Sequence, residues 1–315
     1  MCSSDLFCVR ARVLATASDV ATTSANFTTD SLPARSRIVG AGSGRRDSPA
    51  VDFATMMDLE PHGIDVWVGA GPRYPWGGLY GGQIVAQALQ AAANTVEAQF
   101  RPHSLHAYFI RRGDHTQPVR FEVDRVRNGR SFVTRAVVAR QSVGAILNLS
   151  ASFQVHEEAL EIQTAKLPGI PGPDDLASDR WSPIFDRRFA AAPGEGQVAG
   201  WLRVDADLGD DPVRQACALA YLSDDLPMDA VAALHPDHLS GEDFHRRYMS
   251  ASLDHAVWFH RQFDAAAWHA QWFTCHGLMG ARGLSSGYVF TPDGTHVATV
   301  TQEVLFRQIA SAPAG

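Results

Sequence analysis

The feature that most constrains this 315-residue chain is one structural plan that occurs twice. In each half, a segment with apolar residues at helical spacing precedes a series of strand-like segments. The first helix is expected to follow Gly81 and Gly82 and to run to Ala92. The second is expected over about 211–222. A helix followed by an antiparallel sheet, present twice, predicts the α+β class.

The strands of both halves are predicted from β-branched and aromatic runs that lie between turn signals. Asn128-Gly129 is the strongest hairpin signal, and Thr291-Pro292-Asp293-Gly294 is a second turn. Residues 226–240, after the second helix, are predicted to form a loop. Two such sheets placed edge to edge would cover each other's exposed edges. The predicted strands are 106–110, 119–126, 131–140, 145–155, 252–262, 268–275, 281–290 and 296–307.

Two stretches lie outside the repeated plan. Residues 1–50 are rich in Ser, Thr, Ala and Arg without a sustained period, and we expect a disordered leader there. It is either an inert tail or a targeting signal, although its acidic residues argue against a transit peptide. A Pro/Gly tract at 167–173 indicates a linker over 158–195. The predicted domains are therefore 52–157 and 196–309.

Composition excludes several classes of protein. The net charge of −7 argues against a nucleic-acid partner, whose protein surface should be basic. No apolar run reaches the length of about 20 residues that a membrane-spanning helix needs. The four cysteines form no CxxC pair, which is typical of free thiols in a reducing compartment, and we predict a cytoplasmic location.

Several longer strings then resemble the acyl-CoA thioesterase II family of bacteria and peroxisomes. The resemblance extends over about 52–307, and its motifs occur in the family's order. It implies a double hot-dog fold, in which two antiparallel sheets each wrap around a long helix. It also implies hydrolysis of acyl-CoA without a cofactor, a metal or a covalent intermediate, and assembly into a homo-oligomer. The matching strings are 81–89, 103–114, 127–132, 252–261, 281–283 and 297–303.

The resemblance implies three catalytic residues, all in the second half. Asp224 ends the string Tyr221-Leu222-Ser223-Asp224, Ser252 stands two residues before an Asp-His pair, and Gln302 precedes a glutamate on the last predicted strand. The neighbouring Asp225 is an alternative carboxylate, so the choice between Asp224 and Asp225 stays open at this stage.

These residue types fit thioester hydrolysis, which needs an oriented water, an acceptor for its proton and donors for an oxyanion. Asp224 is expected to act as general base, while Ser252 and Gln302 orient the water. Backbone N–H groups at a helix N-terminus are expected to hold the oxyanion, and Gly81 and Gly82 would permit close approach of the substrate there.

The sequence leaves open whether the phosphates of CoA meet Arg111, Arg112, Arg127 or other basic residues, and Arg111 and Arg127 are the two that we predict to bind substrate. With Gly81 and Gly82 they form the predicted substrate-binding set.

The same residues permit other interpretations of the site and of the activity. Ser252 could be a covalent nucleophile with His255 or His260 as its base, but no Gly-x-Ser-x-Gly elbow surrounds it. A hydrogen-bonded structural role is favoured for both histidines. The runner-up activity is enoyl-CoA hydration, which would use an Asp/His pair that the first helix lacks. A non-catalytic acyl-CoA-binding protein would not need the three polar residues to converge.

Overall fold

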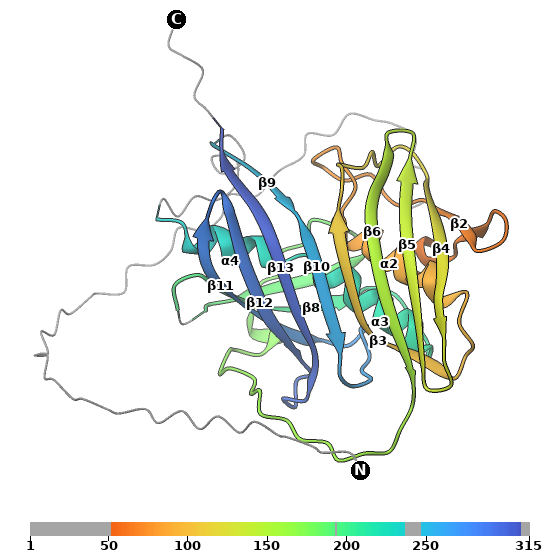
Figure 1. Ribbon diagram of the computed structural model, residues 1–315. Coiled ribbons are helices and arrows are strands. Elements are labelled where there is room, and N and C mark those ends of the chain that lie inside the picture. Colours follow the sequence, from red (N-terminus) through yellow and green to blue (C-terminus); the bar gives the residue numbers. More distant parts are fainter. Residues whose placement is uncertain (1–51, 193, 237–246, 310–315) are drawn as a thin grey trace, which may run out of the picture. The chain divides into compact units, whose positions relative to one another are not determined.

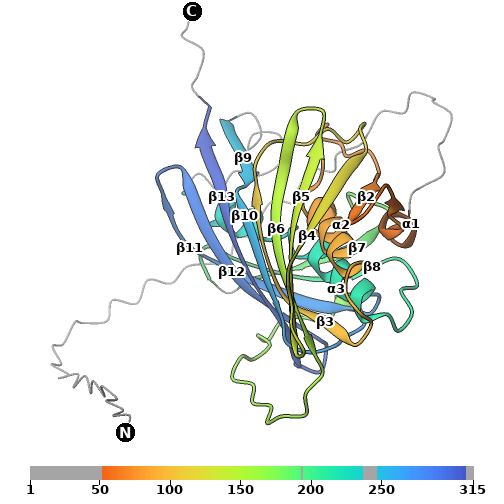
Figure 2. The same ribbon diagram turned by 45° about the vertical axis from the view of Figure 1, so that its right-hand side comes forward.

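The computed structural model describes residues 52–192, 194–236 and 247–309, and over these residues it contains one antiparallel sheet of thirteen strands. The sheets of the two halves are thus continuous, joined edge to edge as the sequence predicted. The strand order is β1-β2-β4-β5-β6-β3-β10-β13-β12-β11-β8-β7, and β9 pairs with β13. Figures 1 and 2 show the helices gathered on one face of this sheet, which curls around them.

The two halves have the following elements. The first contains α1 (Phe53–Met57), β1 (Glu60–Pro61), β2 (Val66–Gly69), α2 (Gly81–Ala93), β3 (Phe100–Phe109), β4 (Val119–Asn128), β5 (Phe132–Gln141) and β6 (Gly144–Val155). A 3-10 turn, η1 (Pro173–Asp175), and β7 (Phe185–Ala190) lead into the second. The second contains β8 (Gln197–Val204), α3 (Pro212–Leu222), α4 (Pro227–Leu234), β9 (Tyr248–Ser252), β10 (Asp254–Phe259), β11 (His269–Met279), β12 (Arg282–Phe290) and β13 (His296–Gln308).

The two central helices begin in different ways. Helix α3 starts at a local cap, since the Asp211 carboxylate accepts a hydrogen bond from the Val213 N–H and Pro212 occupies the first helical position. Helix α2 starts at Tyr80, whose side chain makes no capping hydrogen bond. Its N-terminus therefore needs an acceptor from elsewhere in the molecule.

The halves meet at the antiparallel pair β3–β10. His106 lies opposite Ala256 at the centre of this pair, with Ser104 opposite Trp258 and Tyr108 opposite Asp254. Positions equally far from the central pair are therefore equivalent in the two halves. Joining the strands here removes two sheet edges that would otherwise expose unpaired backbone groups.

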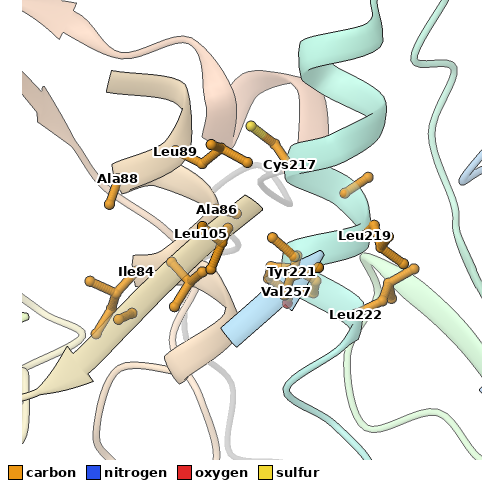
Figure 3. Packing of buried hydrophobic residues seen from close by; sticks show 14 of the residues in the cluster. Ile84, Ala86, Ala88, Leu89, Leu105, Cys217, Leu219, Tyr221, Leu222 and Val257 are labelled. Carbon is orange, nitrogen blue, oxygen red and sulfur yellow. The ribbon is translucent and has the colours of Figure 1, made fainter. Parts of the chain in front are cut away.

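The main core lies between the two long helices and the central strands (Figure 3). Ala86 and Ala88 are both fully buried on opposite sides of α2, with Ala88 on the side away from α3, and Leu89 lies near Cys217 of α3. Leu105 of β3 and Val257 of β10 close the core from the sheet and are both fully buried. The burial of these side chains explains why the two halves form one body rather than two separate domains.

The structure differs from the sequence-based expectations at four places. The predicted loop at 226–240 contains helix α4, which packs on β11 and β12. The predicted linker at 158–195 contains β7, which extends the sheet beside β8. The predicted strand 252–262 is instead two strands, β9 and β10, with a break at Leu253. Helix α1 and strands β1, β2 and β8 were not predicted from the sequence.

The predicted leader, residues 1–50, lies outside the described residues. Within the described parts of the chain, no helix is long and apolar enough to cross a membrane.

Candidate active site

Three elements of the second half bring Asp224, Ser252 and Gln302 together. Asp224 follows the C-terminus of α3, Ser252 ends β9 and Gln302 lies on β13. The Ser252 hydroxyl donates to Asp224 Oδ1 at 3.0 Å, and Gln302 Nε2 donates to Ser252 Oγ at 2.8 Å. The structure thus joins all three predicted catalytic residues in one hydrogen-bonded set.

The break between β9 and β10 is what places Ser252. The Leu253 N–H donates to the Glu303 carbonyl at 2.9 Å, and the Asp254 carboxylate accepts from the Glu303 N–H at 2.6 Å. These bonds hold the break against β13 beside Gln302. The fixed register explains how a serine at a strand end can face a side chain on a neighbouring strand.

The first half supplies the partner of the carboxylate. The Gly82 N–H, in the first turn of α2, donates to Asp224 Oδ2 at 2.9 Å. Asp224 is therefore the external acceptor that the N-terminus of α2 requires, and the helix dipole favours a negative charge there. The site is built across the boundary between the halves.

Both glycines at the start of α2 are required by close approach. A Cβ on Gly82 would lie 2.2 Å from the Tyr221 carbonyl oxygen, and one on Gly81 would lie 2.6 Å from Asp224 Oδ2. The Tyr80 hydroxyl donates to the same Tyr221 carbonyl at 2.9 Å. The start of α2 and the end of α3 are thus in direct contact, with no room for a larger side chain.

Burial and hydrogen bonding act in opposite directions on Asp224. Its side chain is nearly inaccessible, and burial, the largest effect, raises its pKa to about 7. The hydrogen bonds from Ser252 and Gly82 favour the ionised form and lower the pKa, but by less. The carboxyl consequently changes its protonation state near neutral pH, where a general base works best.

A buried chain of polar groups extends the site behind Gln302. His255 Nδ1 lies 2.5 Å from Gln302 Oε1, and His255 Nε2 lies 2.8 Å from Ser223 Oγ. Burial lowers the pKa of His255 to about 4. Both ring nitrogens are thus engaged by groups other than Ser252, which argues against a Ser252–His255 nucleophile pair.

His260 is equally remote from a nucleophilic role, because its Nε2 hydrogen bonds with Thr299. The contacts of His255 with Gln302 and Ser223 escaped the sequence analysis. The only hint was that Ser223 precedes Asp224 and that His255 alternates with a buried valine on the same strand.

Asp225 points into a different environment. Its carboxylate accepts two bonds from Arg187 Nη1, both at 2.9 Å, and one from Trp181 Nε1 at 2.8 Å. Arg187 lies on β7, a strand within the predicted linker. Of the two neighbouring carboxylates, Asp224 joins Ser252 and Gln302, while Asp225 forms a buried ion pair that holds β7 against the end of α3.

The predicted substrate-binding arginines lie at different places. Arg111 follows the end of β3, is exposed and donates to the Ala145 carbonyl at 2.8 Å. Arg261, its equivalent in the second half, donates to the His296 carbonyl at the same distance, so this bond belongs to the repeated fold. Arg127 lies on β4, which β5, β6 and β3 separate from β10. The structure therefore does not bring Arg127 together with the three polar residues.

Among the described residues of the first half, no equivalent site is present. Leu105 occupies the position of His255, as judged from the central pair of β3 and β10. Ser150 opposes His106 as Thr301 opposes Ala256, so Ala151 takes the position of Gln302. Apolar residues stand where the second half has its amide and its imidazole. The repeated fold thus carries this polar set once within the described residues.

Fold and site together define two fused hot-dog units with one polar site at their boundary. A solved hot-dog protein of Alicyclobacillus acidocaldarius, 21% identical, superimposes with a TM-score of 0.68 over 82% of this chain and 98% of that one. The model of the acyl-CoA thioesterase N-terminal domain matches residues 71–154, and that of the C-terminal domain matches 163–306. The chain belongs to the acyl-CoA thioesterase II family.

Two relatives agree with this assignment. Acyl-CoA thioesterase 2 of Haemophilus influenzae is 33% identical over 256 residues, which cover 73% of this chain and 87% of the relative. The crystal structure of the acyl-CoA thioesterase II TesB2 of Mycobacterium marinum is 34% identical, with a TM-score of 0.72 over 82% of this chain and 98% of that one. The predicted family and fold class are both confirmed.

Proposed function

We propose that this chain hydrolyses acyl-CoA thioesters to the free acid and CoA, with Asp224 as the general base. The hydrogen-bonded set of Asp224, Ser252 and Gln302 carries the proposal. A protein that only binds acyl-CoA has no need of a buried carboxyl whose pKa is raised to about 7.

The reaction follows from the chemistry of these groups. A water molecule donates one hydrogen bond to the ionised Asp224, and Ser252 and Gln302 direct its lone pair at the thioester carbon. As the O–C bond forms, the water proton passes to Asp224. The tetrahedral intermediate then collapses, the C–S bond breaks, and the proton is returned to the leaving CoA thiolate.

The oxyanion of that intermediate needs hydrogen-bond donors. The first turn of a helix has backbone N–H groups without helical partners, and the first turn of α2 contacts Asp224 through the Gly82 N–H. Because the Gly82 N–H is bonded to Asp224, we assign the oxyanion to the other N–H groups of this turn. One such donor typically contributes about 10²- to 10³-fold to kcat.

The CoA moiety is assigned to the exposed surface next to the site. Arg111, just beyond the end of β3, is the better placed of the two proposed phosphate contacts, and Arg127 is the more distant. A guanidinium suits this role because its fork of donors matches the oxygens of a phosphate.

The test is release of CoA thiol from acyl-CoA of graded chain length. We expect turnover by the wild type and none above background by Asp224→Asn, with a smaller loss of about 10²- to 10⁴-fold for Ser252→Ala or Gln302→Ala. Acyl-CoA affinity should be retained in all three variants. A wild type that binds acyl-CoA without releasing CoA would indicate a binding protein, and enoyl-CoA hydration measured in parallel would reveal a hydratase.

Two wider proposals accompany this function. A cytoplasmic location is supported by Cys217 and Cys275, which are buried and unpaired. Assembly into a homo-oligomer rests on the family resemblance. Cell fractionation and light scattering of the purified protein test them.

A further inference from the structure

The structure contains a continuous chain of hydrogen bonds that ends at Asp224 and begins at a residue the proposed reaction does not use. From the inside outwards, it passes through Ser223, His255, Gln302 and Ser252. All except Ser252 are fully buried. A buried polar chain has to satisfy the donors and acceptors of each of its members, so the direction of every bond can be worked out.

The direction is set at His255. Gln302 Oε1 can only accept, so the proton of the contact between Gln302 and His255 must lie on His255 Nδ1. Because burial lowers the pKa of His255 to about 4, the ring is neutral at working pH, and its Nε2 carries a lone pair. The Ser223 hydroxyl lies 2.8 Å from Nε2 and 3.2 Å from the Ala220 carbonyl, and its single proton is assigned to Nε2, the nearer of the two acceptors.

The Nδ1–H tautomer of His255 and this orientation of the Gln302 amide require each other. With Oε1 facing the Nδ1–H, the amide NH₂ faces Ser252 Oγ and donates to it. The Ser252 proton is thereby directed to Asp224 Oδ1. If the amide were reversed, its oxygen would face Ser252 and compete with Asp224 for the single hydroxyl proton.

We propose that His255, held in its Nδ1–H form by Ser223, is a positioning residue that fixes the Gln302 amide with its NH₂ toward Ser252. The inference rests on the proposed function, since it assigns His255 a part in the same reaction. Its role is to keep Ser252 donating to the ionised Asp224, and it touches neither the substrate nor the attacking water.

The first half of the chain shows that the fold itself does not need a histidine here. Leu105 occupies the equivalent position on β3 and is also fully buried. Leucine at 255 is therefore compatible with the local packing. The substitution His255→Leu removes the ring nitrogens while copying a side chain that the same fold already accommodates.

The experiment compares His255→Leu with His255→Asn and with His269→Leu. Asparagine can place an N–H donor where Nδ1 stands, and His269 is a second fully buried histidine of the same half whose contacts are to Ala267 and Gln271. His269→Leu therefore controls for the loss of a buried imidazole. Circular dichroism and the thermal midpoint confirm that each variant is folded.

We expect His255→Leu to lower kcat for acyl-CoA hydrolysis by about 10- to 100-fold, the usual effect of removing a group that orients a functional side chain. KM should change little, because ground-state binding is intact. The hydrogen bond from Gln302 helps to lower the pKa of Asp224, so the acidic limb of the kcat/KM profile should move to higher pH. His255→Asn should recover most of the lost kcat, and His269→Leu should keep both kcat and the limb of the wild type.

The tautomer itself gives a readout that is independent of activity. In a ¹⁵N-histidine spectrum of the wild type, His255 should show a protonated Nδ1 and an unprotonated Nε2. A protonated Nε2, or a His255→Leu variant with the kcat and acidic limb of the wild type, would overturn the inference. If in that case Asp224→Asn is still inactive, only the role of His255 fails and the proposed function stands.

Discussion

Replacing Asp224 by asparagine should make the folded protein less sensitive to pH, because the buried carboxyl that titrates near neutrality is removed. In the folded state, the pKa of Asp224 is raised from 3.8 to about 7, mainly by burial. A folded-state pKa above the unfolded value means that the folded protein binds the proton more tightly. Stability from this group is fully present below pH 3.8 and is lost as the pH rises toward 7.

The size of this pH effect on the free energy of unfolding follows from the folded-state pKa of Asp224. Between about pH 5 and about pH 8, the folded protein must give up the proton while the unfolded chain is already ionised at both values. About two pH units of this range lie below the folded pKa. At about 1.4 kcal/mol per unit, the wild type should lose about 3 kcal/mol of unfolding free energy through this one group.

The asparagine variant has no such proton to lose. Its amide can accept from only one of the two donors, Gly82 and Ser252, but that cost is the same at both pH values. Urea denaturation at about pH 5 and about pH 8 should therefore show Asp224→Asn gaining about 3 kcal/mol relative to the wild type on going to the higher pH. Asp174→Asn, at a carboxyl that is 97% exposed, is the matched control and should show no such gain.

If the free energy of unfolding changes by the same amount between the two pH values in Asp224→Asn and in the wild type, the Asp224 carboxyl of the folded protein is ionised at both pH values. The raised pKa, and with it the electrostatic argument for a general base, would then be wrong.

Three further outcomes follow from the contacts in the site. Gly82→Ala places its Cβ against the last turn of α3 and displaces the N–H from Asp224, so it should abolish CoA release and lower the thermal midpoint, whereas Gly169→Ala, where nothing lies within 4 Å, should change neither. Asp225→Asn removes the nearer counter-ion of Arg187, which keeps its contact with Asp179 at 3.3 Å. It should destabilise the fold in urea by less than the roughly 3 to 5 kcal/mol of a buried charge left unpaired, while the folded fraction keeps most of its kcat. Arg111→Ala should raise KM for acyl-CoA more than Arg261→Ala does, because both variants lose the same bond to a backbone carbonyl but Arg111 follows Phe109, whose N–H donates to the Leu253 carbonyl next to Ser252; equal KM values would remove Arg111 from the CoA contacts.

The duplicated plan of the fold could be predicted because hydrophobic periodicity is a local signal. Helix α2 and the Asn128-Gly129 hairpin follow from spacing and turn chemistry within a few residues. Strand β7 could not be predicted in this way. It lies after a Pro/Gly tract, and it becomes a strand because β8 offers it an edge and Asp225 offers its Arg187 an ion partner. Both of these are tertiary contacts.

The candidate active site, like the fold, could be predicted from the sequence only in part. Asp224, Ser252 and Gln302 are predicted through a family resemblance, and their convergence depends on β9 lying beside β13 and on the end of α3 reaching both. The choice between Asp224 and Asp225 needed the structure, because adjacent residues after a helix end can point in opposite directions. The Gly82 N–H came from the other half of the chain, and no local pattern links it to a carboxylate more than a hundred residues away.

The measurement that tests the central claim most directly is the pH dependence of kcat/KM for acyl-CoA hydrolysis by the wild type. For free enzyme with Asp224 as the base, kcat/KM should rise about tenfold per pH unit up to about pH 7 and level off above it. A profile that is flat across this range, or that falls as the pH rises through 7, would contradict an ionised Asp224 as the group that activates water.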